Sequence, residues 1–134
     1  MSRSYAREVV LKTIFQLDFY EYENSDQYIK FINKHDLASA DFEYAQFLTT
    51  SIFNKKNEID GIINKFLVRW DTKRINQMEL AILRLAVYEI LHVDNIPAPV
   101  SINEAINFTV KYCDLESVKY INAVLEKIAK EVVH

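Results

Sequence analysis

We predict an all-α protein of about seven helices, which form two packed helical subdomains around a central buried helix. Two observations lead to this fold class. The 134 residues include 1 Gly and 2 Pro, while 50% are hydrophobic. Tight turns for a many-stranded β fold are therefore scarce, although a packed core can form. In addition, residues 76–93 would be apolar on every side of a helix, and such a helix belongs in the middle of a core.

The ends of this central helix are marked in the sequence. Asn76 is a good N-cap residue, and Glu79 follows it at capping-box spacing. The helix must end before Pro97, which cannot continue it. Its other charges, Arg84 and Glu89, need partners if they are buried, so we expect each to form a structural ion pair or to reach the surface.

The remaining helices follow from apolar residues at helical spacing. The pattern predicts a first helix over residues 1–22, a second that begins at Ser25 or Asp26, and a third that begins at Ser39 or Asp41. Residues 54–58 are either a solvated face of one long helix or a break between two. The subdomains are expected at about 1–72 and 73–134, within a single domain. The last two helices are expected to begin at a Ser101–Glu104 capping box and at an Asp114 cap.

The first helix carries two apolar rows. Leu11, Phe15 and Phe19 lie in the second row, which is offset from a core row that contains Val10 and Ile14. That second row either packs inside the fold or faces a protein partner, since exposed apolar strips often mark binding surfaces.

Composition excludes several classes of function. The net charge is −3, so a nucleic-acid site would need a local basic patch. With one cysteine, Cys113, no internal disulfide can form, and we expect a cytoplasmic protein without a membrane span. The three histidines and Cys113 are too scattered along the chain to suggest a metal site. We also expect no catalysis, because a glycine-rich phosphate loop and a nucleophile elbow are both missing.

Two long motifs resemble the NusB family of bacterial transcription antitermination factors. They are ILRLAVYEI at residues 82–90 and, after Ile96-Pro97, INEA at 102–105. Shorter matches lie at both ends, in Ala6-Arg7-Glu8 with FQL at 15–17, and in KYINAVLEK at 119–127. The resemblance implies an all-helical adaptor that binds boxA RNA of ribosomal RNA leader transcripts together with NusE, a small-subunit ribosomal protein. It also implies an indirect association with the RNA polymerase elongation complex, and it implies neither catalysis nor a cofactor.

The resemblance also implies roles for particular residues. The RNA-binding residues would be Arg3, Tyr5, Arg7, Glu116, Lys119 and Tyr120. Among these, Tyr120 suits stacking on a base, and the arginines and Lys119 suit phosphates. The NusE-binding residues would be Phe15, Phe19 and Glu79.

This chain departs from the family pattern at two places. Ser4 and Tyr5 dilute the arginine cluster with which many relatives begin. Each lost phosphate contact lowers the salt slope by about 0.7 for single strands, so we expect weak RNA binding without NusE. Ala123 stands where the family often has Gly, which favours the helix but could hinder a close backbone approach. Two alternatives remain at this point: the RNA-binding module of a ribosomal RNA cytosine methyltransferase, and a purely structural helical homodimer.

Overall fold

The computed structural model describes residues 2–17, 25–33, 35, 37–67 and 75–131. All regular structure in this part of the chain is helical, which confirms the predicted all-α class. The helices are α1 (Ser2–Leu17), α2 (Ser25–Asn33), α3 (Ser39–Asn54), α4 (Lys56–Phe66), α5 (Gln77–His92), α6 (Ala98–Tyr112) and α7 (Leu115–Glu131). No helix in these ranges is long and apolar enough to cross a membrane.

The chain divides into two compact units, an N-terminal unit over Met1–Lys55 and a C-terminal unit over Lys56–His134. This division lies earlier than the boundary expected near residue 72, which itself falls outside the described residues. The reason is that α4 packs on α5 and α7. Ile59 and Ile63 of α4 are buried, and Asp60 pairs with Arg84 of α5. The segment 54–58 contains a helix break, because α3 ends at Asn54 and α4 begins at Lys56.

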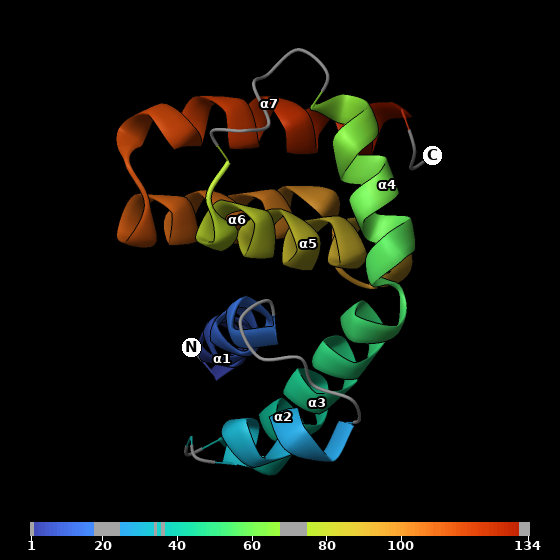
Figure 1. Ribbon diagram of the computed structural model, residues 1–134, viewed down its shortest axis with the longest axis vertical. Coiled ribbons are helices and arrows are strands. Elements are labelled where there is room, and N and C mark those ends of the chain that lie inside the picture. The colour runs from blue at the N-terminus through green and yellow to red at the C-terminus, as the bar shows by residue number, and fades with distance from the viewer. Residues whose placement is uncertain (1, 18–24, 34, 36, 68–74, 132–134) are drawn as a thin grey trace. The chain divides into compact units, whose positions relative to one another are not determined.

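Helix α5 is the core of the C-terminal unit. Every residue from Ala81 to Ile90 is buried, and α4, α6 and α7 all pack against the helix. In Figure 1, α6 and α7 run along α5, while α4 crosses the set at one end. The predicted capping box is present: the Glu79 N–H donates to Asn76 Oδ1 at 2.8 Å, and the Asn76 N–H donates to Glu79 Oε1 at 3.0 Å. A helix apolar on all sides therefore lies where the sequence predicts.

The two buried charges of α5 have different partners. Arg84 forms the expected ion pair, in which Nε and Nη2 donate to the two carboxylate oxygens of Asp60 at 2.8 and 2.9 Å. Glu89 instead accepts a hydrogen bond from the Ser101 hydroxyl of α6 at 3.1 Å. Ser101 is thus not the N-cap that the sequence predicted, and that expectation is wrong. Helix α6 begins at Ala98 and has Pro99 in its first turn. A proline is tolerated there, because the N–H that it lacks would have no helical acceptor.

The N-terminal unit is a three-helix core in which α1, α2 and α3 all contact one another. Val10 and Ile14 of the predicted core row are buried, as is Leu11 of the second row. Phe15 is half-buried. Phe19 lies outside the described residues, as does Tyr22, the end of the predicted first helix.

Thr49 of α3 is fully buried, and its hydroxyl oxygen has no hydrogen-bond partner among the described residues. Replacing it by valine removes the buried polar group at nearly constant shape. We therefore expect Thr49→Val to raise the free energy of unfolding by about 1 kcal/mol in urea denaturation. Thr13→Val is the matched control. Thr13 is equally buried, but its hydroxyl donates to the Val9 carbonyl at 2.7 Å. An equal gain in both variants would show that the missing bond at Thr49 is not the cause.

Candidate nucleic-acid interface

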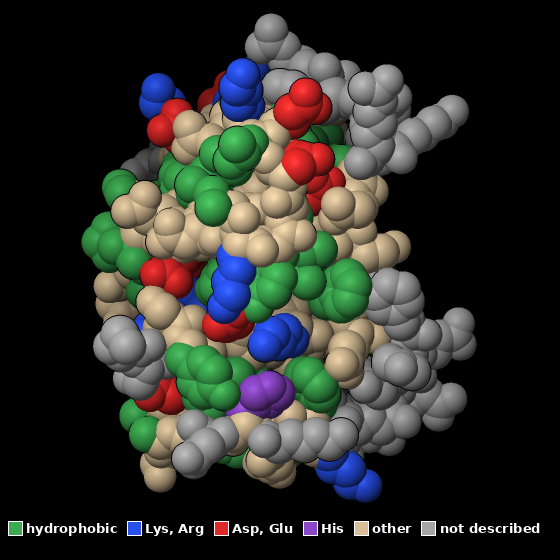
Figure 2. Space-filling model, turned by 90° about the vertical axis from the view of Figure 1, so that its left-hand side faces the viewer, with side chains coloured by type: hydrophobic (Ala, Val, Ile, Leu, Met, Phe, Trp, Pro, Cys, Tyr) green, Lys and Arg blue, Asp and Glu red, His purple; other side chains and the backbone are tan. Residues whose placement is uncertain are grey.

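The start of α1 presents a basic and aromatic surface. Arg3 is exposed, and its guanidinium carbon lies 3.9 Å from the centre of the Tyr44 ring of α3. Tyr5 is 40% exposed, and its ring meets the His35 ring edge-on at 6.4 Å. Figure 2 shows basic and hydrophobic side chains side by side on one face of the molecule. A cation held on an aromatic ring is kept in place without losing its charge, so Arg3 keeps a positive charge at the surface.

Arg7 lies in a different environment from Arg3. It is only 4% exposed, whereas Arg3 is exposed. One turn further along α1 the helix enters the core of the unit, where Ala6, Val9 and Val10 are buried. The predicted arginine pair therefore reaches the surface at Arg3, while the phosphate contact of Arg7 stays a prediction. A shared helix face did not imply shared exposure, because the depth of burial changes along the helix.

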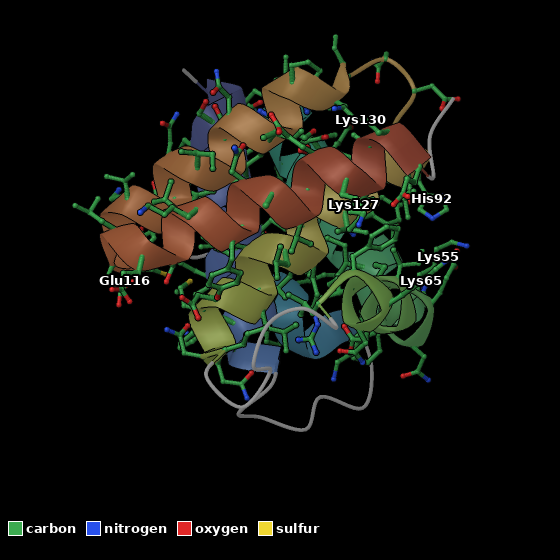
Figure 3. The ribbon with its side chains drawn as sticks, turned by 90° about the horizontal axis from the view of Figure 1, so that it is seen from above. Lys55, Lys65, His92, Glu116, Lys127 and Lys130 are labelled. Carbon is green, nitrogen blue, oxygen red and sulfur yellow. The ribbon has the colours of Figure 1, made fainter. Side chains whose placement is uncertain are left out.

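The first turns of α7 form the second candidate surface. Glu116 and Lys119 are exposed, and Leu115 before them is 75% exposed. Figure 3 shows Glu116 pointing outward at one end of α7, with Lys127 and Lys130 toward the other end. Tyr120 is half-buried. Its stacking on a base stays a prediction.

The hydroxyl end of Tyr120 lies in a buried polar cluster of the C-terminal unit. Its oxygen is inaccessible to solvent and lies beside the Glu79 carboxylate. Ser117, one turn earlier in α7, donates its hydroxyl to Glu79 Oε2. The Ser117 N–H donates to Asp114 Oδ1 at 3.1 Å, which confirms Asp114 as the cap of α7.

Two ionisable groups in this cluster hold their protons firmly. Burial raises the pKa of the Tyr120 hydroxyl above its ordinary value, and the Glu79 carboxylate raises it further. Burial also raises the pKa of the Cys113 thiol from 9.0 to about 11, with smaller contributions from Glu79 and Asp114. Near neutral pH the cluster is therefore a hydrogen-bonding site with a protonated tyrosine and a protonated thiol, and Cys113 has little of the thiolate that a nucleophile needs.

The raised pKa of Cys113 predicts a loss of stability in alkali. Because the folded protein binds this proton more tightly than the unfolded chain, the contribution is complete below pH 9 and disappears as the pH rises through about 11. In urea denaturation at pH 8 and pH 11, wild type should lose more stability than Cys113→Ala. Equal losses in the two proteins would contradict the raised thiol pKa.

The proposed protein-binding residues are only partly described. Phe15 is half-buried on α1, and Phe19 lies outside the described residues. Glu79 is 4% exposed, and its two carboxylate oxygens accept hydrogen bonds from Asn76 and Ser117. Its contact with a protein partner stays a prediction, but the structure gives this carboxylate a role inside the chain.

Reasoning from the sequence missed three contributors to these surfaces: Tyr44 beneath Arg3, His35 beside Tyr5, and Ser117 beneath Tyr120. A signal existed for Ser117, since it follows Asp114 at the spacing of a helix cap. Tyr44 and His35 meet α1 only through tertiary packing, which helical periodicity does not reveal.

The described residues form an all-α protein whose candidate surfaces suit binding, and they hold no group of three or more potential metal ligands. A model of the NusB family matches residues 4–130. The chain is 39% identical to the transcription antitermination protein NusB of Acetivibrio thermocellus, over 97% of this chain and 90% of that protein. The chain therefore belongs to the NusB family.

Solved structures of relatives agree with this assignment. The T. maritima NusB structure is 30% identical and superposes with a TM-score of 0.86, over 98% of this chain and 92% of that one. A second structure, of antitermination factors NusB and NusE in complex with dsRNA, is 25% identical with a TM-score of 0.84, over 96% of each chain.

Proposed function

We propose that this protein is a transcription antitermination factor that binds boxA RNA of ribosomal RNA leader transcripts together with NusE. The observation that carries the proposal is the match to the NusB family along almost the whole chain, including a relative solved with NusE and RNA. On this basis the protein acts in the cytoplasm as a single domain, reaches the RNA polymerase elongation complex indirectly, and works without catalysis or a cofactor.

The RNA would contact two sets of side chains. In the N-terminal unit, Arg3 and Tyr5 are exposed and Arg7 lies one turn further along α1. Arginine is well suited to phosphate oxygens, because its planar group donates several hydrogen bonds at once. In the C-terminal unit, Glu116, Lys119 and Tyr120 lie on the first two turns of α7. Lys119 supplies charge, Tyr120 supplies a stacking surface, and Glu116 can accept hydrogen bonds from base amino groups.

NusE would bind through Phe15 and Phe19 of the second apolar row, with Glu79 as a charged contact. Phe15 supports this assignment because it remains half-exposed, while its row-mate Leu11 is sealed in the core. An aromatic ring that the fold leaves partly open can add buried apolar area when a partner docks.

The proposal is tested by titrating fluorescently labelled boxA RNA with the protein, with and without NusE, at several salt concentrations. We expect weak, salt-sensitive binding by the protein alone and at least about tenfold tighter binding with NusE, because few basic side chains face the RNA. Tight, salt-insensitive binding without NusE would contradict the proposal.

The partner assignment is tested in the same titration with Phe15→Ala. This variant should bind RNA like wild type when NusE is absent and should lose most of the gain that NusE provides. Phe47→Ala is the matched control, because Phe47 is a 49% exposed phenylalanine of the same unit that has no proposed role in NusE binding. Full ternary assembly by Phe15→Ala would reject the assignment.

A further inference from the structure

Glu79 joins the starts of two helices that are far apart in the sequence. Its carboxylate is buried, with the whole residue 4% exposed. One oxygen, Oε1, accepts the Asn76 N–H at 3.0 Å and so completes the cap of α5. The other, Oε2, accepts the Ser117 hydroxyl in the first turn of α7, 38 residues later. A single side chain therefore ties the first turn of α7 to the buried core helix.

This first turn leads directly to the proposed RNA contacts. Ser117 is also held by Asp114, whose Oδ1 lies 3.1 Å from the Ser117 nitrogen and 2.9 Å from its hydroxyl oxygen. Tyr120 follows one turn later, with its hydroxyl end buried beside Glu79. The first turn of any helix has N–H groups without helical acceptors, and it frays unless other groups hold it.

We propose that Glu79 is a positioning residue for RNA binding: through Ser117 it fixes the first turn of α7 and holds the Tyr120 ring where a base can stack. This inference rests on the proposed function and deepens it. A ring held in one orientation loses little conformational freedom when a base stacks on it, and binding is tighter for that reason. Glu79 thus acts on RNA without touching it.

Three variants separate positioning from charge. Glu79→Ala removes both hydrogen bonds. Glu79→Gln keeps an oxygen for the Asn76 N–H, and its amide can donate to the Ser117 oxygen, whose hydrogen then remains available to Asp114. Glu89→Ala is the matched control: Glu89 is a 1% exposed glutamate of the same helix that accepts from a serine hydroxyl, Ser101, but this serine lies on α6, away from Tyr120.

The experiment measures the Kd for boxA RNA of each variant, with and without NusE, at a temperature where circular dichroism shows all of them folded. We expect Glu79→Ala to weaken RNA binding about fivefold in both conditions, a part of the stacking contribution. In the absence of NusE, Glu79→Gln and Glu89→Ala should stay within about twofold of wild type. Equal weakening by Glu89→Ala would show a general effect of stability and would overturn the inference.

A double variant tests whether Glu79 acts through the tyrosine. In a Tyr120→Leu background, Glu79→Ala should change the Kd for RNA by less than about twofold, because the ring it positions is gone. A full fivefold effect there would overturn the inference. If wild type with NusE fails to bind boxA RNA at all, the proposed function fails as well.

Discussion

Replacing Asp60 by alanine should lower the free energy of unfolding by about 3 kcal/mol, because the variant leaves a buried guanidinium without its carboxylate. The Arg84 side chain is 5% exposed, and both of its hydrogen bonds to Asp60 are shorter than 3 Å. Together they join α4 to α5 in the core of the C-terminal unit. Urea denaturation followed by circular dichroism measures the change.

The control for this prediction replaces the other partner of the ion pair, Arg84. Arg84→Met leaves the Asp60 carboxylate, which is 28% exposed and keeps part of its hydration, and it fills the space with an apolar side chain. Its cost should be smaller than that of Asp60→Ala, since replacing a buried charge is cheaper than leaving one unpaired. A larger cost for Arg84→Met would mean that other contacts of the arginine matter more than its carboxylate partner.

Tyr120→Leu should weaken binding of boxA RNA by about tenfold, within the range of roughly 1–3 kcal/mol that stacking on one base contributes. Leucine keeps much of the apolar volume on α7 but has no flat ring for a base. The loss should appear in the Kd with NusE present as well as in its absence, because the ring lies on the proposed RNA surface. Fluorescence anisotropy with labelled RNA measures both values.

Tyr120→Phe is the matched control for stacking. It keeps the ring and removes the hydroxyl, which is buried and cannot reach the RNA. We expect its Kd to stay within about twofold of wild type. If Phe and Leu weaken binding equally, the hydroxyl and its surroundings matter, and stacking is not the contribution that Tyr120 makes.

Features determined by short-range chemistry could be read from the sequence. The capping box of Asn76 and Glu79, the Asp114 cap and the burial of α5 on all sides are present as expected. Each cap depends on residues within one helical turn, and the burial of α5 follows from apolar residues along its own length. The partner of Arg84 could be predicted as a carboxylate, but not as Asp60, which lies 24 residues earlier and reaches Arg84 only after α4 packs on α5.

The rest depended on tertiary packing. Arg3 and Arg7 share a helix face, yet only Arg3 is exposed, because α1 enters the core between them. Ser101 has the spacing of a cap, but it serves Glu89 instead, because the chain becomes helical before Pro99. The hydrogen bond from Ser117 to Glu79 cannot be read from a linear pattern, because the two residues lie 38 positions apart. Side chains that support a surface from inside the fold, as Ser117 does, are therefore not identified by reasoning from the sequence.

The most direct test of a scaffold with separate RNA and protein surfaces is amide hydrogen exchange of the protein with saturating boxA RNA alone and with NusE alone. We expect RNA to slow exchange in residues 115–120, at the start of α7, and NusE to slow it in residues 11–17 of α1. Protection of 115–120 by NusE alone, with no change when RNA binds, would contradict the assignment of these two surfaces.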